Sequence, residues 1–461
     1  MTKPIMLNAF EMMVPAFQSP GLWRHPDDQS RRYAQLSYWT ELAQTLESGG
    51  FTGIFLADIL GQYDIYGGNA DAAMRGGVQY PILDPTLIIS ALAAATTTIG
   101  VGVTVSVTYE EPYLLARRFT TLDHLSDGRV GWNIVTSYQD SAARNLGLTE
   151  QPPHDERYER ADEYMDVVYK LWEGSIDDDA IVADRETGLF VDPAKVRKIN
   201  HEGRYFSVPG PALAEPSRQR TPLLFQAGAS PRGISFAAEN AEAIFFNGYS
   251  TAIVRGWVDA VRGGLVAKGR SADAVKIFTM ATVIVAETDE AAEAKYEDYK
   301  QYVDPEAALA LFGGWTGLDL EGVDVDKPLE HVQSEAHQSA LATFTKLDPT
   351  RVWTVREMAT FISIGGRGPV IVGSPATVVD ELERWMVDAD IDGFNLSSVI
   401  RPGGEEDFVR LVSPELRRRG LLPEPVPGQT FREAVLGKGP RLADDHRGAQ
   451  FRPALAGVPA E

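Results

Sequence analysis

Three side chains in the middle of the chain could together hold a phosphate group. Ser230 and Pro231 stand where a strand-like run passes into a helix-like run, and serine at the N-cap followed by proline makes a well-formed helix start. The free backbone N–H groups of such a start form a site for anions. His154 and Tyr158 lie four residues apart at the start of another predicted helix, so both side chains project from one face. An ordinary helix cap and a half-buried tyrosine have the same pattern, so both interpretations stay open.

Four further polar side chains lie at or near the ends of predicted strands. Asp58 ends one apolar run, Thr104 lies near the end of the next, and Asn133 and Ser137 lie at the end of a third. In an α/β barrel the carboxyl ends of the strands carry the ligand site. Asn133 could there present its amide to a ring edge. The alternatives are that Asp58 caps a turn, that Thr104 is an ordinary strand residue and that Asn133 satisfies backbone groups.

Large apolar side chains gather in the predicted loops and could line a pocket. A concave apolar surface with few polar anchors suits a small apolar substrate. Plain packing in the core or under a lid would explain about half of these side chains equally well. The candidates are Phe10, Met12, Trp23, Tyr63, Phe246 and Trp315.

The segment Ala116–Asn133 predicts a helix, a tight turn and the start of a strand. Gly128 can take the left-handed conformation that ends the helix. The run Val130–Val135 is almost wholly apolar, which is typical of a strand covered on both faces. Helical spacing places four apolar residues on one buried face: Leu115, Phe119, Leu122 and Leu125.

Strand-like runs alternate with helix-like runs along the chain, which predicts a parallel sheet with crossover helices. Eight strand-like runs favour a closed (β/α)8 TIM barrel over an open doubly wound sheet. The predicted strands are Ile5–Phe10, Thr52–Asp58, Thr98–Ser106, Val130–Val135, Pro222–Ala227, Ala243–Asn247, Lys276–Val285 and Gly393–Ser397. The predicted helices between them include Tyr33–Ser48, Thr86–Thr96, Asp155–Trp172 and Ser230–Asn240.

Three long connections interrupt this repeat, after the second, fourth and seventh strands. They cover about residues 62–85, 174–217 and 287–367, and long connections in a compact fold are commonly functional lids. We expect residues 1–421 to form a single barrel domain with these insertions. The Pro- and Gly-rich tail 422–461 is expected to run along the surface or onto a partner subunit.

The composition bounds the class of protein. A net charge of −22 argues against nucleic-acid binding, which needs a concentrated basic surface. The chain has no cysteine, and none of its seven histidines forms a close metal-ligand pair such as HExxH, so no metal site is expected. No apolar run approaches the roughly 20 residues that span a bilayer, and no signal peptide begins the chain. We therefore expect a cytoplasmic protein without a membrane partner, whose chemistry comes from an organic cofactor.

Several stretches, taken in order, resemble one enzyme family. They are WRHP (23–26), FLAD (55–58), TLDHLSDGRVGWNIVTS (121–137), HDERYERADEY (154–164), QAGASPRG (226–233), and VGSP followed by DGFNL near the C-terminus. From about Leu7 to Gly420 the chain resembles the nitrilotriacetate and dibenzothiophene-sulfone monooxygenase branch of the luciferase-like flavin monooxygenases. Within this branch the stretches LNAFEM, QSPGLWRHP, YDIYGG and LFGGWTGLDL most resemble dimethyl-sulfide monooxygenases.

The resemblance implies a TIM barrel that binds FMN without a covalent bond and receives it reduced from a separate NAD(P)H-dependent flavin reductase. Reduced FMN and O2 would then oxygenate a substrate. Homodimers or homotetramers are common among such enzymes. The implied FMN contacts are Asp58, Thr104, His154, Tyr158 and Ser230, with Asn133 and Ser137 beside the ring. No catalytic side chain is assigned, and the candidates are His25 and Asn133.

One departure from the branch bears on the substrate. Many of the sulfone and aminopolycarboxylate enzymes read HTG where this chain has Trp315-Thr316-Gly317. Tryptophan removes a proton donor and adds apolar bulk, which favours a small apolar substrate. Our preferred hypothesis is an organosulfur compound such as dimethyl sulfide, cleaved at a C–S bond. A halogenated aromatic, a deazaflavin-dependent oxidoreductase on the same barrel and a non-catalytic flavin-binding protein are the alternatives.

Overall fold

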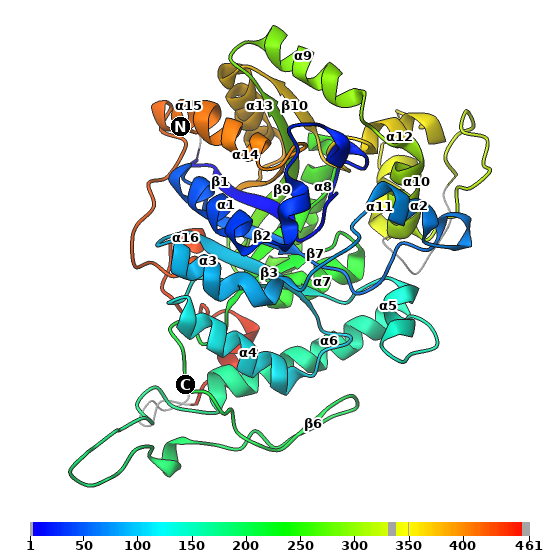
Figure 1. The fold of residues 1–461 in the computed structure, drawn as a ribbon. Helices are drawn as coiled ribbons and strands as arrows, with labels where there is room; N and C mark the ends of the chain where they lie inside the picture. Colours follow the sequence, from blue (N-terminus) through cyan, green and yellow to red (C-terminus); the bar gives the residue numbers. More distant parts are fainter. Residues whose placement is uncertain (1–2, 331–337, 349, 454–461) are drawn as a thin grey trace.

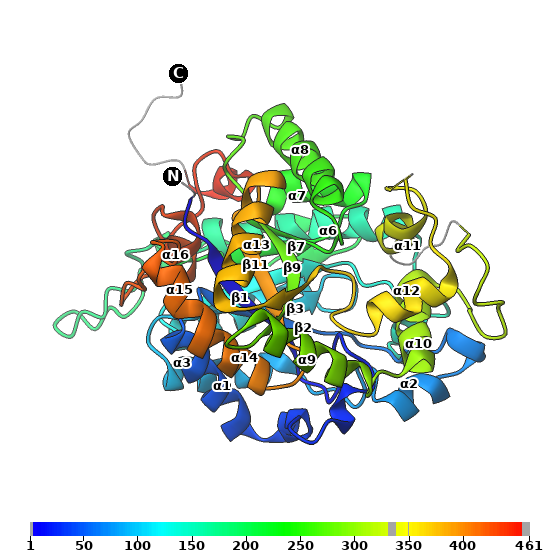
Figure 2. The same cartoon turned by 90° about the horizontal axis from the view of Figure 1, so that it is seen from above.

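Eight parallel strands close into a barrel at the centre of the protein (Figures 1 and 2). The computed structural model describes residues 3–330, 338–348 and 350–453. In order around the barrel the strands are β1 (Met6–Met12), β2 (Gly53–Ala57), β3 (Gly100–Ser106), β4 (Val130–Val135), β7 (Leu223–Ala227), β8 (Ala243–Phe246), β9 (Lys276–Val285) and β11 (Gly393–Ser397). Pairing of β11 with β1 completes the ring. The predicted TIM barrel and all eight predicted strands are confirmed.

A ring of helices covers the outside of the barrel (Figures 1 and 2). Its members are α1 (Leu36–Ser48), α3 (Ile89–Ala95), α4 (Pro112–Leu125), α6 (His154–Tyr169), α7 (Pro231–Asn240), α8 (Thr251–Ala267), α13 (Pro375–Asp388), α14 (Gly403–Asp407) and α15 (Ser413–Arg418). In α4 the residues Leu115, Phe119 and Leu122 are buried as predicted, but Leu125 is exposed. Leu125 is the last residue of the helix, and the left-handed turn at Gly128 follows directly.

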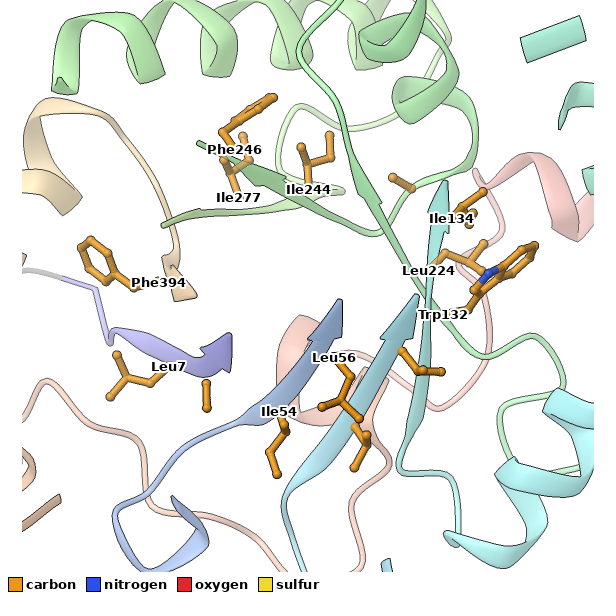
Figure 3. Close-up of a cluster of buried hydrophobic side chains, with 14 of the residues drawn as sticks. Leu7, Ile54, Leu56, Trp132, Ile134, Leu224, Ile244, Phe246, Ile277 and Phe394 are labelled. Carbon is orange, nitrogen blue, oxygen red and sulfur yellow. The ribbon is translucent and has the colours of Figure 1, made fainter. Parts of the chain in front are cut away.

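Alternation along the strands sorts side chains into two apolar layers. Ile54, Trp132 and Phe246 point away from the barrel axis toward the helices (Figure 3). Their sequence neighbours point inward, and the inner layer is built mainly from phenyl rings. The ring of Phe55 packs against those of Phe10, Phe225 and Phe245, with centroids 5.5 to 5.7 Å apart. This phenyl layer fills the middle of the barrel.

The C-terminal segment closes the amino-terminal end of the barrel. We expected residues after Leu422 to run along the surface or onto a partner, but Phe431 begins helix α16 (Phe431–Leu436) and is buried against β2, β3 and β4. Gly53 and Gly100 leave room for its ring, because a β-carbon at either glycine would collide with it. Residues 454–461 of the tail lie outside the described residues.

A buried ion pair holds α16 in place. Arg432 donates two hydrogen bonds to Glu242, at 2.7 and 2.8 Å, and further ones to the carbonyl oxygens of Thr221, Pro222 and Pro440. Burial alone would raise the pKa of Glu242. Coulombic attraction to the Arg432 guanidinium and the hydrogen bonds from it hold this pKa below its ordinary value. Each charge is therefore paired and hydrogen-bonded, as burial requires.

The first and third insertions meet over the carboxyl ends of the strands. Helix α2 (Asp71–Gly76) comes from the first, and α10 (Pro305–Thr316), α11 (Gln338–Thr345) and α12 (Val355–Ile362) come from the third. We call these four helices the cap; they share one apolar cluster and lie together on one side of the molecule (Figures 1 and 2). Residues 331–337 and 349 of this insertion lie outside the described residues. In the chain, helix α9 (Asp289–Lys300) precedes α10 and strand β10 (Val370–Gly373) follows α12; the two pack against each other, and β10 extends the sheet beside β9.

The second insertion extends away from the barrel (Figure 1). It carries a small antiparallel hairpin of β5 (His201–Glu202) and β6 (Ser207–Val208). Helix α5 (Asp140–Asn145) precedes it in the chain. In the described ranges no helix is long and apolar enough to cross a membrane.

The phenyl ring of Phe431 should contribute strongly to stability, because its removal leaves a cavity at the end of the barrel. We expect Phe431→Ala to lower the free energy of unfolding by about 3–5 kcal/mol. Phe190→Ala, at a site where 68% of the side chain is exposed, should change it by less than about 0.5 kcal/mol. Urea unfolding followed by circular dichroism measures both. Equal effects of the two substitutions would contradict this role of Phe431.

Candidate active site

A cavity of about 210 Å³ lies at the carboxyl ends of the barrel strands. The phenyl rings of Phe10, Phe55 and Phe245 form part of its wall, and residues that follow β2, β4 and β7 surround it. A second cavity of about 530 Å³ adjoins it and shares Asp58 and Thr104 with it. Ligand pockets commonly measure about 300–1,000 Å³, so the two cavities offer room for a cofactor and a small substrate.

Most residues that the sequence singled out line this first cavity. All seven predicted cofactor residues do so: Asp58, Thr104, Asn133, Ser137, His154, Tyr158 and Ser230. Four of the six predicted pocket residues also do so: Phe10, Met12, Tyr63 and Trp315. Both insertions of the cap contribute residues, whereas none of residues 174–217 lines the cavity.

Phe246 lies on the other side of the barrel wall, against Trp257 of α8, with ring centroids 5.3 Å apart. The prediction that Phe246 lines the pocket is therefore wrong. Because side chains alternate along a strand, the neighbouring Phe245 faces the cavity instead. The sequence shows two adjacent phenylalanines at the end of β8 and cannot tell which one points inward.

Trp23 and His25 also lie away from the cavity. The indole N–H of Trp23 donates to the carbonyl oxygen of Gly76 at 3.1 Å and so ties the N-terminal segment to α2. The His25 imidazole is buried, and its Nε2 lies 2.9 Å from a carboxylate oxygen of Asp298. His25 is therefore a structural residue here and no candidate for proton transfer in the cavity.

Polar side chains surround a helix start at one end of the cavity. Helix α7 begins there, and the Ser230 hydroxyl accepts a hydrogen bond from the backbone N–H of Gly233 at 3.0 Å. The imidazole Nε2 of His154 lies 3.4 Å from the Ser230 hydroxyl. The Tyr158 hydroxyl lies directly over Gly233, since a β-carbon there would be 2.8 Å from it. Burial raises the pKa of Tyr158, so its hydroxyl keeps its proton at neutral pH. Polar side chains from the starts of α6 and α7 thus converge on the positive end of a helix dipole.

Side-chain amide oxygens without partners line the walls of the same cavity. The side-chain oxygens of Asn133, Gln226 and Asn247 are buried and have no hydrogen-bond partner among the described residues. The amide nitrogen of Asn133 donates to the Thr104 hydroxyl at 2.9 Å. A buried amide oxygen left without a partner costs about 1–3 kcal/mol. These groups therefore fit the edge of a ring that carries N–H and C=O groups, such as the isoalloxazine of FMN.

Asp58 is a carboxyl group with a strongly altered acidity. Burial first, and then the nearby charge of Asp84, raise its pKa to about 8, and a hydrogen bond from the backbone N–H of Ile59 opposes the shift. At neutral pH the group is mainly protonated in the protein described here. Asp58 can then donate a hydrogen bond as well as accept one.

An aromatic wall completes the cavity, with rings from the first and third insertions and from the segment after β4. The Tyr63 hydroxyl donates to Oε1 of Gln79 at 2.8 Å and lies 2.9 Å from the Tyr138 hydroxyl. Gly314 lets the Tyr63 ring approach α10, because a β-carbon at this position would overlap the ring. The guanidinium of Arg367 lies 4.7 Å from the centre of the Trp315 ring.

Sequence reasoning missed several of these polar residues. Tyr138 belongs to a polar triplet that follows β4, and Gln226 and Asn247 stand at or just after the ends of strands, so position was an available signal. Arg367 lies in a Gly-Arg-Gly sequence, and this pattern before a strand indicates only a turn. For Gln79 the sequence offers no signal. No group of three or more metal-ligating side chains occurs among the described residues.

The raised pKa of Asp58 predicts a specific pH dependence of stability. The folded protein holds this proton up to about pH 8, whereas the unfolded chain loses it near pH 4. The free energy of unfolding should therefore fall as pH rises between these values. Asp58→Asn removes this contribution, so the wild type should lose stability relative to the variant from pH 5 to pH 8.

Thermal unfolding of both proteins without ligand, at several pH values, measures this difference. Asp71→Asn, at an exposed position that starts α2, provides the control and should follow the wild type at every pH. Parallel curves for the wild type and Asp58→Asn would contradict the raised pKa.

Comparison with known proteins places these features in one family. Residues 12–392 match the family described as luciferase-like monooxygenase. The chain is 49% identical to dimethyl-sulfide monooxygenase of Hyphomicrobium sulfonivorans over 99% of this chain and 95% of that protein. It is 44% identical to the long-chain alkane monooxygenase of Geobacillus thermodenitrificans over 98% and 99% of the two chains.

A solved structure shows the same fold with a flavin. The crystal structure of a riboflavin lyase with modified FMN and riboflavin superimposes with a TM-score of 0.92, at 38% identity, over 98% of this chain and 100% of that chain. With the barrel, the cavity and these relatives together, the chain belongs to the luciferase-like monooxygenase family and is a flavin-dependent monooxygenase.

Proposed function

We propose that this enzyme is the oxygenase component of a two-component system that uses reduced FMN and O2 to oxygenate a small organosulfur compound. One observation supports it above all. A single cavity has an anion-binding end at His154, Tyr158 and Ser230 and unpartnered amide oxygens at Asn133 and Gln226. A phosphate and a polar heteroaromatic ring on one molecule would satisfy both.

Each group of residues then has a separate task. The start of α7, with His154 and Tyr158, binds the phosphate. Asn133 and Gln226 orient the edge of the ring. At the end of β2 the protonated carboxyl group of Asp58 donates a hydrogen bond. Bound FMN supplies the two-electron chemistry that activates O2, which none of these side chains can supply. The cap covers the cavity and limits access of water to the reacting atoms.

The partner of this oxygenase is a separate NAD(P)H-dependent flavin reductase that delivers reduced FMN by diffusion. The enzyme itself forms a homodimer or homotetramer. One atom of O2 enters the substrate, and the other leaves as water with two electrons that come from NAD(P)H through FMN. Hydroxylation of a carbon next to sulfur makes the C–S bond break into an aldehyde and a thiol.

The walls of the cavity support a small substrate with an apolar part. Phe10, Met12 and Trp315 offer apolar surface beside the polar groups that we assign to FMN. The related proteins act, by their names, on dimethyl sulfide and on long-chain alkanes. A sulfur compound with a short carbon chain fits both the walls and these relatives.

The phosphate assignment predicts the effect of two substitutions on FMN binding. Tyr158→Phe and Ser230→Ala each remove one hydroxyl from the anion-binding end, so each should weaken FMN binding by about 1–3 kcal/mol. Quenching of FMN fluorescence on titration with protein measures the affinity. Tyr113→Phe removes a hydroxyl that donates to the Pro211 carbonyl outside the cavity and should leave the affinity unchanged. If both cavity variants bound FMN as the wild type does, the phosphate would lie elsewhere.

The activity itself can be tested by O2 uptake with FMN, NADH and a generic flavin reductase. We expect uptake that depends on a dialkyl sulfide or a related organosulfur compound, with formation of an aldehyde and a thiol. Chlorinated phenols and benzenes serve as comparison substrates. Chloride release without aldehyde would replace the organosulfur proposal by a dehalogenation, and the absence of any oxygenated product would contradict a monooxygenase of either kind.

A further inference from the structure

Arg367 is a buried cation on the cavity wall without an anionic partner. It lines the cavity, and only 8% of the residue is exposed. Among the described residues its guanidinium lies over the Trp315 ring and near the hydroxyls of Tyr138 and Tyr63, and no carboxylate lies within 4.0 Å of it. Six other arginines are buried in the described part of the chain, and each donates to a carboxylate or a carbonyl oxygen: Arg129, Arg157, Arg220, Arg270, Arg401 and Arg432.

The backbone before Arg367 holds the side chain in this place. Gly365 and Gly366 both have positive φ, 79° and 67°, which other residues adopt only with strain. The N–H of Gly365 donates to the Ser19 hydroxyl at 3.0 Å, and a β-carbon on Gly366 would collide with the Gln18 side chain. The loop is thus packed closely against the N-terminal segment. Its position is set by the fold and not by a ligand.

The surroundings keep Arg367 charged but supply no counter-ion. Burial lowers its pKa to about 10, and the neighbouring Tyr63 and Tyr138 hydroxyls oppose the shift. At neutral pH the guanidinium is therefore protonated. Contact with the face of Trp315 stabilises a cation only partly, because the ring carries no net charge. Burial of an unpaired charge is costly, so such a group is expected to meet an anion.

We propose that Arg367 binds a negatively charged oxygen group of the substrate, which makes the substrate a small organic oxoanion such as an organosulfur sulfonate, sulfinate or carboxylate. This inference rests on the proposed function. The planar guanidinium can donate two parallel hydrogen bonds to such a group. Tyr63 and Trp315 then contact the carbon chain. The phosphate of FMN is a separate anion, since its proposed site is built from the starts of α6 and α7 and not from the cap.

This assignment changes the expected substrate in one respect. Trp315 alone, read from the sequence, favours an apolar substrate. Together with Arg367 it favours a molecule with an apolar part and one anionic head. A neutral dialkyl sulfide would leave the guanidinium without a partner and should bind less well.

The test compares two unreactive or slowly reacting probes of similar size on enzyme loaded with oxidised FMN. Isothermal titration at constant ionic strength measures the affinity for 1-propanesulfonate and for the neutral methyl propyl sulfide. We expect the wild type to bind the sulfonate more tightly. Arg367→Gln should weaken sulfonate binding about 10- to 100-fold and change sulfide binding by less than about twofold. Arg367→Lys, which keeps the charge but loses the planar fork, should give an intermediate affinity.

The matched control is Arg356→Gln. Arg356 lies on α12 of the cap and pairs with the exposed Asp326, outside the cavity, so its loss should leave both affinities unchanged. Equal binding of the two probes by the wild type, or equal sulfonate binding by Arg367→Gln, would overturn the inference. If Arg367→Gln does not fold, two measurements still test the inference. They are the preference of the wild type for the sulfonate over the sulfide and the sulfonate affinity of Arg367→Lys. FMN titration of the wild type is read separately, because absence of FMN binding would contradict the proposed function and not the role of Arg367.

Discussion

Closure of eight parallel strands into a barrel is the constraint on which the rest of this structure depends. Closure forces alternate side chains to the inside and the outside of every strand. The inside layer of phenyl rings fills the middle of the barrel, and Phe431 fills its amino-terminal end. Space for a ligand therefore remains only at the carboxyl ends of the strands, where the backbone leaves the barrel and polar side chains can follow.

Buried charged and polar groups occur both in the body of the fold and at the cavity. Arg432 with Glu242 and Arg401 with Glu11 are buried pairs in which each charge has its partner within the chain. At the cavity the amide oxygens of Asn133 and Gln226 and the guanidinium of Arg367 have no such partner among the described residues. In the described part of the chain, unpartnered buried atoms also occur away from the cavity, for example both carboxyl oxygens of Glu405 and the hydroxyls of Tyr38 and Tyr164. What distinguishes the cavity is that unpartnered polar groups and open space occur there together.

The barrel and the insertions supply residues for different ligands in our proposal. Residues that we assign to FMN come from the strand ends and from the starts of α6 and α7. Tyr63, Trp315 and Arg367, which we assign to the substrate, come from the first and third insertions. Because the insertions can vary without disturbing the strand ladder, relatives with one cofactor can differ in substrate.

The amino-acid sequence by itself determined the eight strands, the barrel and the residues at the starts of α6 and α7 that line the cavity, because these depend on local periodicity and on position at the ends of strands and helices. It could not decide between Phe245 and Phe246, since register depends on pairing with β7 and β9. It could not place Phe431 in the barrel, because the matching glycines lie more than 290 residues earlier in the chain. Nor could it reveal Arg367 as a cavity residue. Only tertiary structure brings a loop after α12 against Trp315, and only burial shows that this arginine lacks a counter-ion.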